Sequence, residues 1–334
     1  MSGRFGSSRL PQARRLFASA VVLLLLTAPL LLRPGQIKLL TEILLVLGFA
    51  QSWNLLAGYT GLMSFGHQGF IGVGAYVVFF VSNATGLNPF LLLPLAALFT
   101  ATVAALLAPL VLRLRDAYFA IALWVLAEVA RLYASQSEWL GAVSGLPLAA
   151  TRSMDRGWVT TGNYWVAAVL AIAAVPGMRT LLRSRLGLAL VAVRDNESTA
   201  AAVGIDVWRT RFLSLVIAAG GCGAAGAAYY MAVFHVDPGA AFDPNWVVVV
   251  LFIVIVGGIG TVEGPVLGTA IYFALRALLA DAGNVYLIVL GAAAVVVMLI
   301  EPRGVWGYLH RRTGIELLGT RRRPPAAVGT EEST

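Results

Sequence analysis

The chain has 334 residues, of which 59% are hydrophobic and only 12% are charged. This composition excludes a soluble globular domain, because apolar runs of about 20 residues match the hydrocarbon core of a bilayer. The net charge of +8 does not indicate nucleic-acid binding, since the basic residues cluster beside the apolar runs without interleaved aromatic residues. The runs are also too long and continuous for the strands of a β-barrel. The sequence predicts an all-α, polytopic transmembrane helical bundle.

Four arginines between residues 4 and 15 precede the first apolar run. Secretory and twin-arginine signals share this pattern, but no small-residue cleavage site follows, and the run ends at Arg33-Pro34. We therefore expect residues 1–15 to be a basic cytoplasmic N-terminus and the first run to be a retained span.

About ten spans are expected, with eight to ten as the range, and together they form a membrane domain over residues 16–302. The predicted spans cover residues 16–33, 37–57, 63–83, 89–112, 117–134, 163–182, 212–235, 245–262, 265–281 and 284–300. Residues 303–334 are basic and are expected to form a disordered cytoplasmic tail.

Basic residues orient the bundle. With an even number of spans both termini lie on one side, and that side collects Arg4, Arg9, Arg14, Arg15, Arg113, Arg115, Arg179, Arg183, Arg185, Arg194, Arg209, Arg211, Arg303, Arg311, Arg312, Arg321, Arg322 and Arg323. Only Arg33, Lys38, Arg131, Arg152 and Arg156 fall toward the other side, and Arg276 lies inside a span. The positive-inside rule then places both termini in the cytoplasm.

Two glycine-rich segments, residues 58–76 and 257–268, are typical of helices that approach one another closely or break beside a cavity. A third, residues 220–226, contains the sole cysteine, Cys222, and has no charged or hydroxyl side chain, so it indicates packing alone. The candidate residues of a path for a polar solute are Asn54, Tyr59, Ser64, Gly66, His67, Gln68, Gly257, Gly258, Gly260 and Glu263.

Ser64 and His67 are expected at i and i+3 on one helical face, where with Gln68 they would line the path or cross-link helices. A nucleophilic serine is a third interpretation, but no Gly-x-Ser-x-Gly elbow is present and no acidic partner is evident nearby. Glu263 is expected to be an exposed carboxylate or a gate.

Charged residues inside the spans have candidate partners close in sequence. Glu42 follows Lys38 by four residues and Glu128 precedes Arg131 by three, which favours ion pairs over proton carriers. Metal ligands and cofactors are not expected, because the three histidines are far apart and no metal-binding spacing occurs. The single lysine also rules out the P-loop motif, so any ATP hydrolysis belongs to another chain.

Residues 183–211 form a long polar break and are expected to be a cytoplasmic loop. A short helix is predicted there, with Asp195 or Asn196 as its N-cap, the alanines at 200–202 inside it and Gly204 just past its end. An exposed helix with small side chains suits docking into a groove of another protein.

Several stretches together resemble the membrane subunits of ABC importers for branched-chain and other hydrophobic amino acids, the LivM-type permeases. The similar stretches are residues 54–61, 64–67, 72–76, 112–120, 257–268 and 301–304, so the resemblance covers most of the chain. It implies a permease that is not itself an enzyme, in a bacterial inner membrane. It also implies that Arg194, Asp195, Asn196, Glu197, Ala201 and Gly204 couple to the ATPase.

The resemblance further implies three protein partners: ABC ATPase subunits, a second permease subunit and an extracytoplasmic binding protein. The loop at residues 135–162, with Trp139, Arg152, Arg156 and Trp158, is the candidate docking surface for the binding protein, and an interfacial anchor is the alternative. The rival function is a stand-alone secondary transporter or channel, and an intramembrane enzyme is a third hypothesis.

Overall fold

The computed structural model describes residues 24–25, 27–29, 31–149, 156–279 and 285–313. The elements in chain order are α2 (Pro34–Thr60), α3 (His67–Thr85), η1 (Pro89–Leu92), α4 (Leu93–Val111), α5 (Asp116–Gln136), η2 (Glu138–Leu140), η3 (Ala142–Ser144), β1 (Leu146–Pro147), α6 (Arg156–Arg183), α7 (Arg185–Asp195), α8 (Glu197–Ala202), α9 (Val207–Val233), β2 (His235–Val236), α10 (Pro238–Ala241), α11 (Asn245–Gly257), α12 (Gly264–Leu278), α13 (Val285–Ile300) and α14 (Gly304–Thr313). The predicted helical bundle is confirmed.

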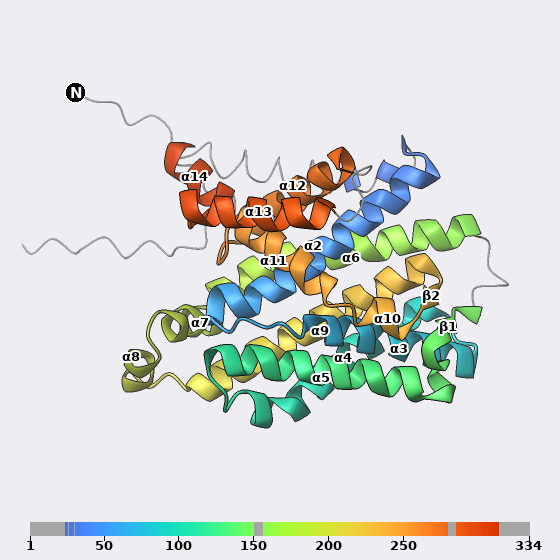
Figure 1. Cartoon of the computed structure of the whole chain (residues 1–334), viewed down its shortest axis with the longest axis horizontal. Coiled ribbons are helices and arrows are strands. Elements are labelled where there is room, and N and C mark those ends of the chain that lie inside the picture. The colour runs from blue at the N-terminus through green and yellow to red at the C-terminus, as the bar shows by residue number, and fades with distance from the viewer. Residues whose placement is uncertain (1–23, 26, 30, 150–155, 280–284, 314–334) are drawn as a thin grey trace, which may run out of the picture.

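The long helices lie side by side, and the bundle has two distinct ends (Figure 1). Helices α7 and α8 lie at one end, which we call the loop end. The strands β1 and β2 pair in antiparallel fashion at the other, which we call the strand end. Successive helices from α2 to α6 run alternately between the two ends, as short connections between antiparallel neighbours require.

Helix α9 lies at the centre and packs against α2, α3, α4 and α6. Small residues permit this packing: a Cβ on Gly74 of α3 would overlap the Gly223 carbonyl of α9, and one on Gly226 would lie 2.5 Å from the Ile71 carbonyl oxygen. Cys222, on the same helix, is buried. The packing role predicted for residues 220–226 is confirmed, because these glycines let the backbones of α3 and α9 meet.

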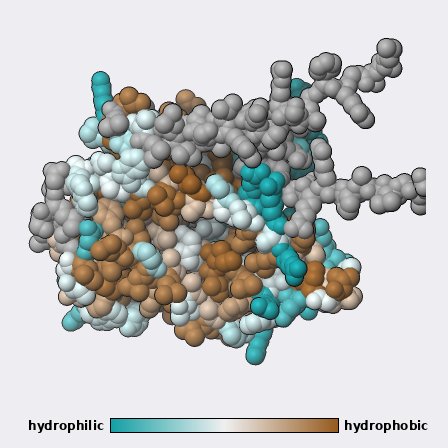
Figure 2. Space-filling view, turned by 180° about the vertical axis from the view of Figure 1, so that it is seen from behind, coloured by the Kyte–Doolittle hydropathy of each residue, from teal (hydrophilic) through white to brown (hydrophobic). Residues whose placement is uncertain are grey.

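The outside of the bundle is apolar. Figure 2 shows large hydrophobic areas over the middle of one face, whereas strongly hydrophilic side chains gather toward the loop end, on the right in that view. Long exposed apolar side chains on α4, α5 and α13 include Leu106, Val129 and Leu299. Large exposed apolar areas are rare on soluble proteins and mark a membrane-facing surface. Among the described residues, eight helices have the length and composition to cross a membrane.

The boundaries differ from the predicted spans in several places. The first predicted span, residues 16–33, lies mostly outside the described residues. Helix α11 ends at Gly257 and forms a spanning segment together with α10, over Pro238–Gly257, so the predicted span 245–262 lies too far toward the C-terminus; α12 has 15 residues and ends at Leu278, within the predicted span 265–281. A glycine-rich turn over residues 258–263 separates the two helices and accounts for the end of α11 at Gly257. The polar break ends at Asp206, the N-cap of α9, rather than at Arg211.

The loop predicted over residues 135–162 is more ordered than expected at both ends, because α5 continues to Gln136 and α6 begins at Arg156. The strand β1 within this loop pairs with β2, and Asn83 of α3 donates to the Pro147 carbonyl oxygen at 2.8 Å and accepts from the Ala149 amide at 2.9 Å. At the other end of the chain, α14 occupies the first part of the segment predicted to be a disordered tail.

Candidate functional site

One face of α2 holds the turn between α11 and α12 (residues 258–263) at the loop end. Asn54 Nδ2 donates to the Thr261 carbonyl oxygen at 2.8 Å, and Asn54 Oδ1 accepts from the Gly260 amide at 2.9 Å. One helical turn earlier, Gln51 Nε2 donates to the Val262 carbonyl oxygen at 2.7 Å. Both polar side chains are buried. They pin the turn to α2 through its backbone, so the contact depends on the shape of the turn rather than on its side chains.

Glycine is required on both sides of this contact. Gly260 has φ +72°, in the left-handed region that favours glycine. A Cβ on Gly58 would overlap Asn54 Oδ1 and lie 2.6 Å from the Gly260 amide nitrogen. The glycine at 257 is equally constrained, because its Cβ would overlap the Gly264 carbonyl. The predicted path residues Asn54, Gly257 and Gly260 are therefore brought together, as a closed and tightly packed junction. We call α2 residues 51–58 with the turn 258–263 the loop-end junction.

The polar break reaches this junction through Arg194, in the last turn of α7. Arg194 Nη1 donates to the Gly58 carbonyl oxygen at 2.8 Å, while its Nε and Nη2 donate to the carboxylate of the adjacent Asp195. Tyr59, the next residue of α2, is buried. Glu263 is half-buried rather than the exposed carboxylate that we expected. One predicted coupling residue thus contacts the loop-end junction.

The polar break contains two helices where we predicted one. Asn196 caps α8 by accepting from the Thr199 amide at 2.9 Å, and Gly204 follows that helix with φ +85°, as expected. Asp195 instead ends α7. Glu197 forms an ion pair with Arg211 of α9 at 3.0 Å, which ties α8 to the bundle. The amphipathic pattern of residues 185–195 is weak, which is why sequence reasoning missed α7.

The exposed face of α8 is small and largely uncharged. Ala201 and Gly204 are exposed, and Val203 between them is 71% exposed. Asn196, Glu197 and Arg194 are occupied by contacts within the chain. The predicted coupling set therefore divides into residues that hold α7 and α8 in place and residues that face outward.

Ser64, His67 and Gln68 lie at the start of α3 and are buried. We expected Ser64 on a helix, but it lies in the segment between α2 and α3. There its Oγ lies 2.9 Å from Nδ1 of His67. Its carbonyl oxygen accepts from Trp53 Nε1 at 2.8 Å. The Gly66 amide lies 3.3 Å from Ser64 Oγ. This geometry links the segment before α3 to α2, which is the cross-linking alternative of the prediction.

The two predicted ion pairs had different outcomes. Glu128 and Arg131 are paired within α5, as expected. Glu42 of α2 pairs with Arg276 of α12 and not with Lys38. The close approach of α12 to α2 explains this difference, and sequence spacing contains no sign of it. The Glu42–Arg276 pair lies in an open hollow of about 920 Å³ near the strand end, which sequence reasoning did not predict.

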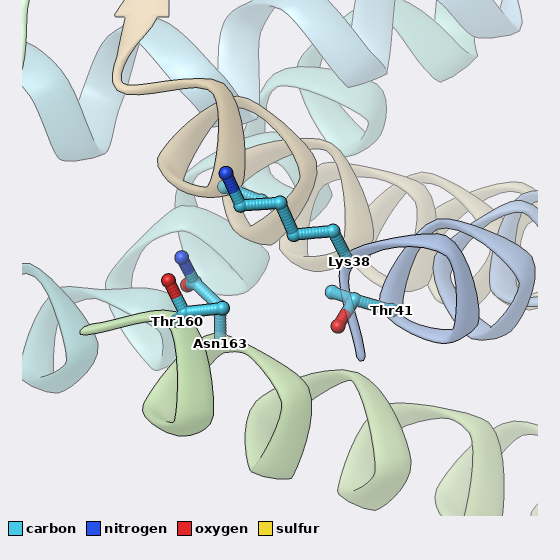
Figure 3. Close-up of a pocket in the computed structure, with 5 residues that line it drawn as sticks. Lys38, Thr41, Thr160 and Asn163 are labelled. Carbon is cyan, nitrogen blue, oxygen red and sulfur yellow. The ribbon is translucent and has the colours of Figure 1, made fainter. Parts of the chain in front are cut away.

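A second, much smaller hollow lies between α2 and α6. Figure 3 shows Lys38 and Thr41 of α2 facing Thr160 and Asn163 of α6 across it. Its volume is about 10 Å³, close to what one water molecule needs. Asn163 Oδ1 is buried and has no hydrogen-bond partner among the described residues. No group of three or more His, Cys, Asp or Glu within the described ranges could hold a metal ion.

Comparisons with known proteins agree with this architecture. The high-affinity branched-chain amino acid transport system permease protein LivM of Salmonella typhimurium is 27% identical over 318 residues, covering 87% of this chain and 75% of that protein. The protein of the same description in Escherichia coli is 28% identical over 320 residues, with the same coverage. A probable branched-chain amino acid transport permease protein LivM of Methanocaldococcus jannaschii is 25% identical over 286 residues, covering 73% of this chain and 82% of that protein.

No solved structure matches the chain. The family model described as the permease component of the branched-chain amino acid transport system matches residues 36–300. This range includes α2 with the loop-end junction, α7 and α8, and the hollow at the strand end. The chain therefore belongs to the family of permease components of branched-chain amino acid transport systems.

Proposed function

We propose that this chain is the membrane-spanning subunit of an ATP-driven ABC importer for branched-chain or related amino acids in a bacterial inner membrane. Family membership supports the transport role and the substrate class. The clustering of arginines at the loop end supports a cytoplasmic position for that end and for both termini. The strand end then faces outward.

Helix α8 is the proposed docking element for the ATPase. Its outward surface includes Ala201 and continues into Val203 and Gly204 just past the helix end, and these small and apolar residues fit a groove on a partner protein. The contacts of Asn196 and Glu197 hold this surface in a fixed orientation. A rigid docking element transmits a movement of the partner instead of absorbing it.

The contact between Arg194 and Gly58 is the observation that carries the proposal. It joins the segment that would meet the ATPase to the junction that closes the bundle at the loop end. A displacement of α7 and α8 by the ATPase would pull on Gly58 and, through Asn54, on the turn at 258–263. Alternating access then follows, because the loop end opens as this junction separates.

Two further partners are part of the proposal. An extracytoplasmic binding protein would deliver the amino acid at the strand end, where β1 pairs with β2. Trp139 is exposed in η2 of the same loop, and Trp158 is exposed near the start of α6. A second, related permease subunit would complete the path, since such a path lies between facing halves of a transporter. Lipid would cover the apolar faces of α4, α5 and α13.

The test is ATP-driven uptake of radiolabelled L-leucine by proteoliposomes that contain this chain, its sister permease, the ATPases and the binding protein. Uptake that requires all four components and ATP hydrolysis is the expected result. Uptake by this chain alone, driven by an ion gradient and indifferent to ATP, would instead establish the alternative of a secondary transporter or channel.

The docking element is tested by Ala201→Glu, which places a charge on the exposed face of α8. We expect the ATPase to be lost from the purified complex while the chain keeps its melting temperature. Ala117→Glu is the matched control, because Ala117 is also exposed at the loop end but belongs to α5. Equal retention of the ATPase by both variants would remove α8 from the proposal.

A further inference from the structure

The hollow at the strand end lies among α2, α9, α11 and α12 and is open to the outside of the bundle. Its volume of about 920 Å³ lies at the upper end of the range of small-molecule sites. The break between α10 and α11 forms part of its rim. Irregular backbone at membrane depth is tolerated where it lines a cavity, so the broken helix itself indicates a solvated space.

One ion pair lines this hollow. Glu42 of α2 accepts from Nη1 of Arg276 of α12, and their side chains are 24% and 47% exposed. Charges within membrane-spanning helices are costly and mark functional sites by default. Two other carboxylates on the rim accept hydrogen bonds from backbone amides: Asp237 accepts from the Ala240 amide, and Asp243 accepts from the Asn245 amide. Glu42 and Arg276 are thus the opposite charges that this hollow offers side by side.

Both members of the pair keep unused hydrogen-bonding capacity. A guanidinium has five N–H donors, and the contact with Glu42 uses one nitrogen of Arg276. A carboxylate has about four acceptor positions, which leaves room on Glu42. A solute carrying both an ammonium and a carboxylate group can therefore join the pair in alternating sign, with its carboxylate on Arg276 and its ammonium on Glu42.

The rest of the wall is aromatic. Tyr229 and Trp246 meet edge to face with ring centroids 4.8 Å apart, and the Arg276 guanidinium lies 5.6 Å from the centroid of the Phe273 ring. Tyr272 and Val249 also line the hollow. These surfaces suit an apolar side chain, because they remove it from water without requiring any hydrogen bond of it.

We propose that the Glu42–Arg276 pair and the surrounding aromatic wall form a binding site for the zwitterion of an α-amino acid with an apolar side chain, on its way into the transporter. The inference rests on the proposed function and adds to it the place where the solute first contacts the permease. Arg276 confers selectivity for the carboxylate, and Glu42 confers selectivity for the ammonium group.

The experiment uses the assembled transporter in nanodiscs, with Cys222→Ala to remove the native thiol and Ala277→Cys to report from the hollow, which Ala277 lines. A charged thiol reagent labels this cysteine. L-Leucine, L-leucinamide and 4-methylpentanoate are then titrated as protecting ligands; the second lacks the carboxylate and the third lacks the ammonium. We expect L-leucine to protect at lower concentration than either analogue.

Each charge is removed separately. Arg276→Gln should reduce the preference for leucine over leucinamide at least tenfold, and Glu42→Gln should reduce the preference for leucine over 4-methylpentanoate at least tenfold, since each variant removes a charge-assisted hydrogen bond to the group that the analogue lacks. Arg131→Gln, which breaks the ion pair within α5, is the matched control and should change neither ratio. A purely structural ion pair would lower stability in all three variants without changing these ratios.

The outcomes separate the inference from the function on which it rests. Unchanged ratios in both Glu42→Gln and Arg276→Gln would overturn the site, even where ATP-driven leucine uptake by the wild type persists. Failure of the cysteine to react without any ligand would also overturn it, because a partner subunit would then cover the hollow. If a single variant does not assemble, the double variant Glu42→Arg with Arg276→Glu takes its place, because it keeps the ion pair but exchanges the two charges. We expect neither ratio, leucine over leucinamide nor leucine over 4-methylpentanoate, to return to its wild-type value.

Discussion

The two ends of the bundle are built from different interactions. At the loop end, Gln51 and Asn54 are buried and hydrogen-bonded to the backbone of the 258–263 turn, and Gly58 excludes any side chain from the contact. At the strand end, the same helix α2 contributes Glu42 to an open hollow with aromatic walls. One helix thus takes part in a closed junction and, about two turns away, in an open site. The difference indicates a bundle that is shut at one end and accessible at the other.

The most severe way to break the closed end is Gly58→Val. The added side chain would overlap Asn54 Oδ1 and the Gly260 backbone, so the turn must move away from α2. Overpacking of this kind costs about 1–3 kcal/mol, and we expect leucine uptake in proteoliposomes to fall at least tenfold. Gly177→Val in α6 is the control, because a Cβ there meets nothing within 4 Å. Similar losses in both variants would show that the junction has no special role.

Asn54→Ala should have the next largest effect. It leaves the Gly260 amide and the Thr261 carbonyl without their partner, at a cost of about 1–3 kcal/mol for an unsatisfied buried group. A lower melting temperature of the purified chain in nanodiscs is the measurement. Thr102→Ala, which removes a hydroxyl bonded only within its own helix, should leave the melting temperature nearly unchanged. If the two variants melt alike, Gln51 and the glycine contacts hold the turn without Asn54.

Glu197→Gln tests whether α8 is fixed by its ion pair with Arg211. The pair is partly exposed, so its loss should cost only about 0.2–1 kcal/mol and leave the fold intact. The expected change is weaker retention of the ATPase during purification, because α8 is no longer oriented. Glu197→Arg combined with Arg211→Glu restores the pair and should restore retention. A double variant as weak as the single one would mean that Glu197 itself contacts the ATPase.

The smallest effect is expected at the strand end from Asn83→Ala. This change removes both hydrogen bonds to the β1 segment, but both bonds lie at the exposed surface and their loss leaves the helices packed. Hydrogen exchange should accelerate at the Leu148 amide, which donates to the Phe234 carbonyl oxygen, while the melting temperature changes little. Thr85→Ala on the same helix is the control. An unchanged exchange rate at the Leu148 amide would show that pairing with β2 alone holds the β1 segment in place.

Hydrophobicity and charge predicted the helical bundle, because a continuous apolar run has one solution in lipid. The capping of α8 by Asn196 and the glycine after it were equally predictable, since both are local. The Glu42–Arg276 pair was not, because the two residues are 234 positions apart and Lys38 offered a closer partner. Rules based on sequence spacing favour Lys38, four residues from Glu42, as its partner. Only the packing of α12 on α2 brings Arg276 to Glu42 instead.

The predicted path residues illustrate the same limit. Sequence reasoning grouped Asn54 with Gly257 and Gly260 because they are polar or small, and the structure brings them together. It did not include Gln51, although a glutamine three residues before Asn54 on an apolar helix was a usable signal. It also assigned Ser64 to a helix, because nothing in the sequence marked His67 as the first residue of α3.

Helices α11 and α12, with 13 and 15 residues, rise about 20 and 22 Å, which is less than the roughly 30 Å of a hydrocarbon core. On its α11 side this hairpin reaches spanning length only together with α10, over Pro238–Gly257, whereas α12 remains shorter, so the acyl chains beside α12 must thin or neighbouring protein must cover its ends. Its turn is fastened to α2 by the side chains of Gln51 and Asn54. Under the proposed mechanism, bilayer thickness would act on this fastening, and the lipid around the protein would influence how readily the loop end opens.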